Sequence, residues 1–348
     1  MGMGGAHRHL SSVSLPTNIE TCKRAPLISG NPLIPWIAFL VCGPASGRGN
    51  GIKAIYRAMR TSWGDRMIEN RPWLTAAAHA TLILGVVVIA FPIYVTVIAS
   101  THSLPTLLTG RIPLLPGSEG FANYAQVLGE GLSAAGAPPV TSMLLNSLAM
   151  ALGICIGKIA ISIIAAYAIV YFQFPLRMTC FWLIFATLML PVEVRILPTY
   201  KVVSDLGMLD SYAGLIVPLI ASATATFLFR QFFLSVPEEL TEAARIDGAG
   251  PIRFFFDILL PLSRTSIAAL FVIQFIYGWN QYLWPLIVTT KQGYYTVVMT
   301  ISRMVNVVDV APSWNLIMAT ALLAMLPPVL VVLVMQRWFV KGLVETEK

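Results

Sequence analysis

Six long apolar stretches constrain the fold of this 348-residue sequence more than any other feature. A helix needs about 20 mostly apolar residues to cross the hydrocarbon core of a bilayer, and each stretch is long enough. An open strand would leave backbone groups unpaired in lipid, so each stretch should be a helix, kinked where it contains proline. The expected spans are residues 74–100, 143–172, 180–200, 212–234, 266–289 and 313–340.

The composition agrees with an all-α integral membrane protein. Hydrophobic residues make up 57% of the chain and charged residues only 11%, and the mean hydropathy is +0.75. A soluble domain carries roughly a quarter charged residues, so this chain is too apolar to stay in water. The same figures exclude disordered, collagen-like and disulfide-scaffold classes. Four cysteines without CxxC or CxxH spacing favour neither a disulfide framework nor a metal site.

The basic residues are distributed unevenly between the two sides that six spans define. Of the 23 Lys and Arg residues, 17 lie in the N-terminal tail, the second and fourth connections and the C-terminal end. The other three connections hold four, and Lys158 and Arg195 lie within spans. Because cytoplasmic loops carry an excess of Lys and Arg, we expect both termini and the fourth connection in the cytoplasm.

Residues 1–66 differ from the rest of the chain. They are rich in Gly, Pro, Ser and Arg, and their one apolar run, residues 35–42, is too short to span. The segment does not follow the order of a secretory signal peptide. We expect a disordered extension, or translation from a start upstream of a natural start at Met67. Residues 67–348 would then form the six-helix domain.

The fourth connection, residues 235–266, reads SVPEELTEAARIDGAGPIRFFFDILLPLSRTS. Pro237 before two glutamates suits a helix start, and Gly248 permits the left-handed backbone that ends a helix. Pro251 can begin a second short helix. This pattern predicts two short helices bent at a glycine; an ordinary amphipathic loop is the alternative. The second helix would bury an apolar face formed by Phe254, Phe255, Ile258 and Leu259.

The same segment resembles the EAA motif of ABC importer permeases, EAA-x2-DGA-x5-F-x5-PL. Nine positions match: Glu242, Ala243, Ala244, Asp247, Gly248, Ala249, Phe255, Pro261 and Leu262. The resemblance assigns the first six of these to coupling with an ATPase. It also implies the type I ABC permease fold, with six transmembrane helices and a cytoplasmic loop at residues 235–266. Thr265 stands where the family often has a further proline.

Other segments are similar to the carbohydrate-importer permeases of the maltose-permease type. They are LGMLDSYAGLIVP at 206–218 and WNQYLWPL at 279–286. Residues 188–200, 224–233 and 276–286 most resemble the permeases of sn-glycerol-3-phosphate importers. The resemblance implies a bacterial inner-membrane heterodimer with a second permease chain, two ATPase subunits that use ATP and a periplasmic substrate-binding protein. It implies no cofactor, metal or nucleic acid on this chain.

Polar groups inside spans are costly in lipid and usually face the bundle interior or a water-filled path. The substrate-path candidates are therefore Arg195, Lys158, Asn280, Gln281 and Trp279. A guanidinium fork suits phosphate, so we expect Arg195 to line the outward part of the path. Ion pairs with carboxylates are the alternative for both cations. Asn280 and Gln281 could hydrogen-bond a polyol or join helices, and Trp279 could anchor at the membrane interface.

Three classes of function compete for this sequence. An ABC importer permease would carry sn-glycerol-3-phosphate, a glycerophosphodiester, or alternatively a neutral sugar or polyol. A secondary transporter would show discontinuous helices in paired halves and would not need the cytoplasmic loop. A membrane enzyme would need clustered His, Asp or Glu, and two of the four His residues lie in the tail. The EAA segment favours the importer permease.

Overall fold

The computed structural model describes residues 72–110, 113–132, 136–187, 192–307 and 311–344. The predicted extension, residues 1–66, lies outside these ranges. The chain divides into two units, Met1–Ala80 and Thr81–Lys348, and the first is described only where its last residues begin a helix. Within the described ranges, strand pairing is limited to a single bridge between Leu132 and Ala137.

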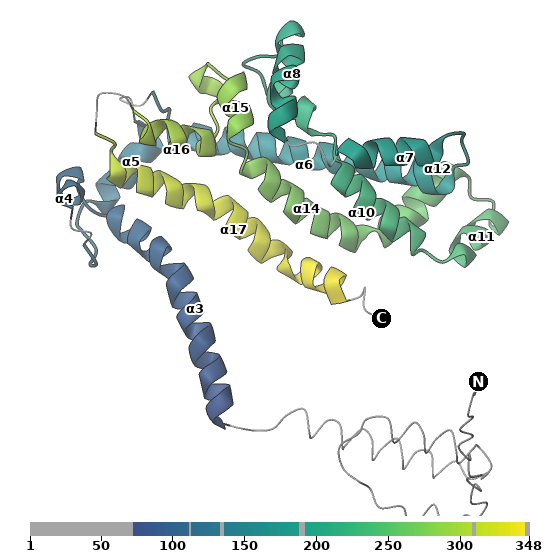
Figure 1. The fold of residues 1–348 in the computed structure, drawn as a ribbon, viewed down its shortest axis with the longest axis horizontal. Coiled ribbons are helices and arrows are strands. Elements are labelled where there is room, and N and C mark those ends of the chain that lie inside the picture. Colours follow the sequence, from purple (N-terminus) through teal and green to yellow (C-terminus); the bar gives the residue numbers. More distant parts are fainter. Residues whose placement is uncertain (1–71, 111–112, 133–135, 188–191, 308–310, 345–348) are drawn as a thin grey trace, which may run out of the picture. The chain divides into compact units, whose positions relative to one another are not determined.

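Three of the described helices are long and apolar enough to cross a bilayer without interruption (Figure 1). They are α3 (Pro72–Ala99), α6 (Val140–Tyr171) and α17 (Trp314–Val344), which correspond to the first, second and sixth predicted spans. Pro92 lies inside α3, and Pro327 and Pro328 lie inside α17, so none of these prolines ends its helix.

The fourth predicted span is a bent pair of helices. α9 (Tyr212–Ile216) and the short η4 (Val217–Leu219) precede α10 (Ala223–Leu234), and the chain turns by 47° between them. Pro218 lies at this bend, as a proline inside a span predicts. Ser222 begins α10 as its N-cap, where its side chain accepts a hydrogen bond from the backbone N–H of Ala225.

The third and fifth predicted spans are each divided between two helices. α7 (Arg177–Ala186) precedes α8 (Val192–Asp205), and α14 (Arg264–Trp279) precedes α15 (Leu283–Val288). With 10 residues, α7 is too short to cross a bilayer alone. The described helices amount to three spans, or five if each bent pair is one span, so the count of six remains a prediction.

α6 is the central helix of the second unit. It packs most extensively against α14 and α10 and supplies residues to all three apolar clusters of the core. Its GICIG segment, residues 153–157, contains two glycines that allow the segment with Ile216 and Ile220 to approach closely. Small residues have this role in membrane helices. A Cβ atom at Gly153 would lie 2.7 Å from Ile216 Cδ1, and one at Gly157 would lie 2.5 Å from Ile220 Cγ2.

Short helices cover the end of the bundle away from α11 (Glu238–Ile246) (Figure 1). They are α4 (Leu104–Leu108), α5 (Gly120–Gly129), η6 (Gln292–Tyr294) and α16 (Val297–Val305). Buried amides hold them in place. The Nδ2 of Asn146 donates to the carbonyls of Gly293 and Tyr295, and the Nδ2 of Asn315 donates to Asn123 Oδ1.

Candidate functional site: a coupling loop and a buried cation

The predicted bend of the EAA segment is present. α11 begins directly after Pro237 and ends at Ile246, and its first turn holds Glu238 and Glu239. Carboxylates at this position are favoured by the positive end of the helix dipole. Gly248 follows with φ +72°, so the prediction of left-handed backbone there is confirmed.

The EAA and DGA triplets together form the C-terminal cap of α11. The N–H of Gly248 donates to the carbonyl of Arg245 at 3.0 Å, and the N–H of Ala249 donates to the carbonyl of Ala244 at 2.9 Å. These two bonds define a Schellman motif, in which apolar residues at the two outer positions usually touch. Ala244 is buried, and Ala249 packs against the same cluster. The last alanine of each triplet therefore serves the fold of the loop.

The second half of the loop enters the core. α12 (Pro251–Arg253) begins at Pro251 as predicted, and it continues through the π-helical turn η5 (Phe254–Leu259) and α13 (Leu260–Leu262). Phe254 and Leu259 are buried, and Phe255 and Ile258 are half-buried beside them, which confirms the predicted apolar face. After Ser263 the chain turns by 71° into α14.

The same cluster joins α10 and α11 to this segment. Phe229 and Phe233 of α10 lie in it with Ala244, and Tyr167 of α6 donates a hydrogen bond to the carbonyl of Pro251 at 2.8 Å. We use the name loop cluster for the buried residues Phe229, Phe233, Ala244, Phe254 and Leu259 and the apolar residues packed against them. α10, α11 and η5 are therefore packed together through one apolar cluster.

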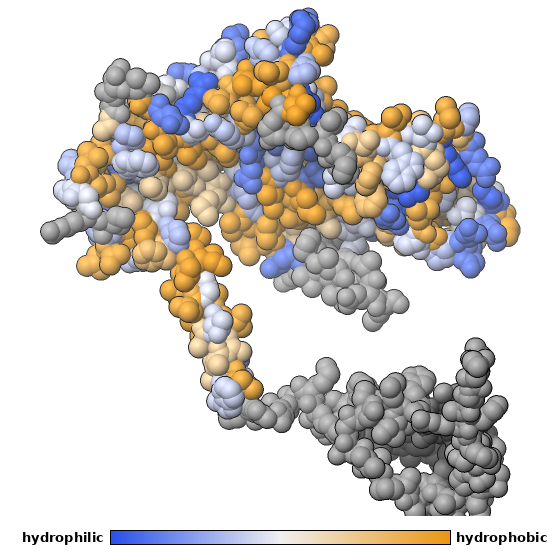
Figure 2. Space-filling view, in the orientation of Figure 1, coloured by the Kyte–Doolittle hydropathy of each residue, from blue (hydrophilic) through white to orange (hydrophobic). Residues whose placement is uncertain are grey.

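The outer surface of the loop mixes charged and apolar side chains. Glu242, Ala243 and Asp247 are exposed, and Ile246 and Ile252 are 86% and 75% exposed. Figure 2 shows hydrophilic residues gathered over α11 and α12, in contrast to the apolar surface along α17. A charged surface with prominent isoleucines is suited to contact with another protein.

The substrate-path candidates include one deeply buried cation. The side chain of Lys158 on α6 is 6% exposed, and its Nζ lies 3.4 Å from the ring centroid of Tyr277 on α14. A cation over an aromatic face is stabilised by the ring quadrupole. The ion pairs found in the described ranges join Lys201 to Asp205 and Arg253 to Asp257, so the carboxylate partner considered for Lys158 is not among them.

Arg195 lies in the first turn of α8 with an exposed side chain. Glu193, two residues before Arg195, is one carboxylate that could pair with it, and its side chain is not among those that the structure describes.

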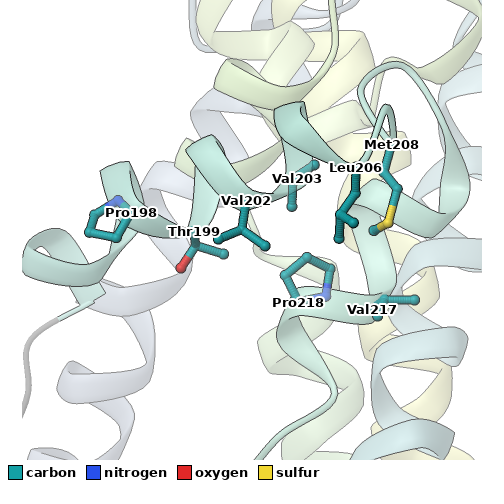
Figure 3. A pocket seen from close by; sticks show the side chains of 8 residues that line it. All are labelled: Pro198, Thr199, Val202, Val203, Leu206, Met208, Val217 and Pro218. Atoms are coloured by element: carbon teal, nitrogen blue, oxygen red, sulfur yellow. The ribbon is translucent and has the colours of Figure 1, made fainter.

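An apolar groove of about 360 Å³ leads along α8 from the turn that holds Arg195. Val202 of α8 and Leu206, which directly follows α8, face Val217 and Pro218 of η4 across it (Figure 3). Further lining comes from Pro198, Thr199, Val203 and Met208. Positions 195, 198, 199 and 202 recur at helical spacing, so Arg195 lies on the groove side of α8.

The remaining candidates occupy the end of α14. Trp279 is buried inside the bundle, where its Nε1 donates to the carbonyl of Ala324 at 3.1 Å, so its geometry is that of helix packing. Asn280 is exposed at the break between α14 and α15. The Nε2 of Gln281 donates to the carbonyl of Tyr277, one turn earlier on the chain. The structure does not bring these three side chains to Lys158.

Two loops at the end away from α11 are joined by hydrogen bonds to one carboxylate, which the sequence analysis did not predict. We refer to this contact between Asp210 and residues 290–291 as the latch. Asp210 has φ +52°, and its carboxylate accepts hydrogen bonds from Thr290 Oγ1 at 2.7 Å and from the N–H of Lys291 at 2.8 Å. These two bonds hold the pKa of the Asp210 carboxyl below its ordinary value.

In the described ranges, no three His, Cys, Asp or Glu side chains come together as a metal site.

Long apolar helices with a buried cation between them are typical of a membrane transport protein. The chain belongs to the family of binding-protein-dependent transport system inner membrane components, which matches residues 158–345. It is an all-α, multi-pass integral membrane protein of this family.

Relatives and a solved structure agree with this assignment. The chain is 59% identical over 282 residues to the sn-glycerol-3-phosphate transport system permease protein UgpE of Agrobacterium fabrum, a match that covers 81% of this chain and 100% of the relative. The proteins of the same name from Rhizobium meliloti and Escherichia coli O157:H7 are 57% and 56% identical over the same shares. A bacterial ABC transporter involved in the import of the acidic polysaccharide alginate shares the fold, with a TM-score of 0.67 at 21% identity over 78% of this chain and 99% of that one.

Proposed function

We propose that the chain is one permease of an ATP-driven importer for sn-glycerol-3-phosphate or a glycerophosphodiester. The observation that carries this proposal is the 59% identity over the full length of a relative named as an sn-glycerol-3-phosphate permease. Lys158 is buried and forms no ion pair among the described side chains, which supports an anionic substrate. The importer would also contain a second permease chain, two ATPase subunits and a periplasmic substrate-binding protein.

The orientation follows from the charges. Seventeen Lys and Arg residues fall on the side of the termini and the EAA loop, against four on the other side. We therefore place both termini and α11 in the cytoplasm, where ATPase subunits operate. The short helices α4, α5 and α16 then face the periplasm and the binding protein.

The EAA loop would transmit motion from the ATPase to the spans. Exposed Glu242, Ala243 and Asp247 would contact a groove on an ATPase subunit, while Gly248 and the Ala244–Ala249 contact keep α11 in shape. Closure of the ATPase dimer would move α11, and the loop cluster would carry α10 and η5 with it. Such rigid-body transfer through a packed interface is a common form of conformational switching.

α14 connects this movement to the cation. The helix has 16 residues and spans about 24 Å, from the bend after Ser263 to Trp279, and it carries Tyr277 near its far end. Tyr277 covers Lys158, so a shift of α14 would change the exposure of the ammonium group. We propose that Arg195 receives the phosphate from the periplasmic side and that Lys158 holds it deeper in the path. A low-dielectric path requires such partners, because an unpaired anion there is costly.

Competition in whole cells tests the substrate. Cells that lack their own glycerol-3-phosphate uptake would express the chain with the subunits encoded beside it, and uptake of labelled sn-glycerol-3-phosphate would be measured. Unlabelled glycerol-3-phosphate should compete, and maltose and glycerol should not. Competition by maltose or glycerol, with none by the phosphate ester, would assign the chain to a neutral solute instead.

A further inference from the structure

Arg230 on α10 carries a charge that nothing in the described chain neutralises. Its guanidinium carbon lies 4.3 Å from the centroid of the Phe181 ring on α7, and its Nε is buried without a hydrogen-bond partner. The two ion pairs formed in the described ranges do not include it. Buried N–H donors are nearly always paired, and the described residues supply no acceptor for this one.

Aromatic side chains line the seam between α7 and α10 next to Arg230. Phe185 of α7 and Phe227 of α10 meet across it with ring centroids 5.7 Å apart, and Phe181 packs edge-on against Trp182 at the same distance. Trp182 and Leu183 are nevertheless 58% and 64% exposed. The seam therefore presents a broad apolar surface with an arginine at one end.

A second cation lies at the same end of the seam. Arg177 is the first residue of α7, one turn before Phe181 and on the same helix face. α10 ends at Leu234, one turn after Arg230, and the EAA loop follows. In the proposed orientation, both arginines lie at the depth of the phospholipid headgroups of the cytoplasmic leaflet, where tryptophan side chains such as Trp182 are also enriched.

We infer that the α7–α10 seam binds an anionic phospholipid, with its phosphate on Arg230 and Arg177 and an acyl chain along Trp182. Arg230 is half-buried, so a phosphate can reach its guanidinium group from the membrane side, and guanidinium groups bind phosphate in a fork geometry. Basic pockets between helices on the cytoplasmic side are suited to such headgroups. This site rests on the proposed orientation of the chain and is independent of the transported solute.

The lipid would also stabilise the support of the EAA loop. Phe229 and Phe233, the neighbours of Arg230 on α10, belong to the loop cluster under α11. A headgroup bound at Arg230 fixes the cytoplasmic end of α10 against α7. The seam therefore links the anionic-lipid content of the membrane to the rigidity of the coupling element.

Lipid selectivity of the purified complex tests this inference. The full chain, purified with its co-expressed partner subunits, would be exchanged into mixtures of phosphatidylglycerol and phosphatidylcholine, and retained lipids would be counted by native mass spectrometry. The wild type should prefer phosphatidylglycerol, and Arg230→Gln should reduce this preference about tenfold, since bonds to charged groups are the strong ones. Phe181→Leu keeps the charge and removes the ring, so it should reduce the preference by only about threefold.

Arg253→Gln is the matched control, because this exposed arginine at the same end already has Asp257 within 3.2 Å. Its lipid preference should equal that of the wild type. An unchanged preference in both Arg230→Gln and Arg177→Gln overturns the inference. Loss of partner subunits from Arg230→Gln with lipid preference intact also overturns it, because Arg230 then pairs with a partner's carboxylate. Displacement of the retained lipid by excess inorganic phosphate would identify a site for the free ion instead. Because the readout counts lipids, its failure is distinct from a failure of the transport proposal.

Discussion

Replacing Gly248 with valine tests whether the bend of the EAA loop couples ATP hydrolysis to uptake. Gly248 has φ +72°, and a Cβ atom there would meet nothing within 4 Å, so the cost is confined to the backbone. Left-handed backbone costs a residue other than glycine about 1–2 kcal/mol. If the chain relieves this strain, it loses the two Schellman bonds, each worth about 1 kcal/mol. A change of 1–2 kcal/mol alters the population of the capped loop by a factor of about 5–30.

We expect Gly248→Val to insert and assemble like the wild type, because the loop cluster keeps all its side chains. The assay is the ratio of solute imported to ATP hydrolysed in proteoliposomes, which should fall by about fivefold or more. Gly248→Asn is the matched control, since asparagine tolerates left-handed backbone, and it should retain most of the coupling. Wild-type coupling in Gly248→Val, at normal expression, would show that the left-handed bend is not needed for coupling.

Other changes probe the path, the core, the outer latch and the tail. Arg195→Gln should lower uptake of the phosphorylated solute about tenfold with assembly intact, and Arg195→Lys should restore only part of it; normal assembly with unchanged uptake contradicts this. Gly157→Val should lower the free energy of unfolding by about 1–3 kcal/mol, seen as a lower melting temperature, and adding Ile220→Ala should recover part of this loss. Because the pKa of Asp210 is lowered in the folded chain, its stabilising effect is complete above its ordinary pKa of 3.8 and is lost as the pH falls through the folded value. Asp210→Asn should therefore melt below the wild type at neutral pH, and the gap should close in strong acid; a gap that persists there rules out the latch. A chain that begins at Met67 should insert and transport like the full chain, since its 282 residues equal the length over which the relatives match; loss of assembly on truncation would make the extension a functional domain.

The EAA loop was predictable because its signals are local. Proline at position 237 fixes the start of α11, glycine at 248 permits the left-handed cap, and proline at 251 begins the next helix. Each signal acts within a few residues, so it survives whatever the rest of the chain does. The motif also contains the packing contact between Ala244 and Ala249, which the sequence pattern does not distinguish from a contact with a partner.

The interior of the bundle was less predictable, because hydropathy does not separate helix faces that meet each other from faces that meet lipid. Trp279 shows this limit: its partner, the carbonyl of Ala324, lies 45 positions along the chain. The cover of Lys158 by Tyr277 likewise depends on how α6 and α14 cross. The latch from Asp210 to Thr290 spans 80 positions and leaves no periodic signal.

The most direct test of the transport proposal is ATP-dependent uptake by a defined complex. Proteoliposomes would contain this chain, the second permease and the ATPase subunits, with the binding protein and labelled sn-glycerol-3-phosphate outside and ATP inside. We expect accumulation that requires hydrolysable ATP and this chain, and that falls when Lys158 is replaced by methionine. Accumulation that proceeds without ATP, or without this chain, would contradict it.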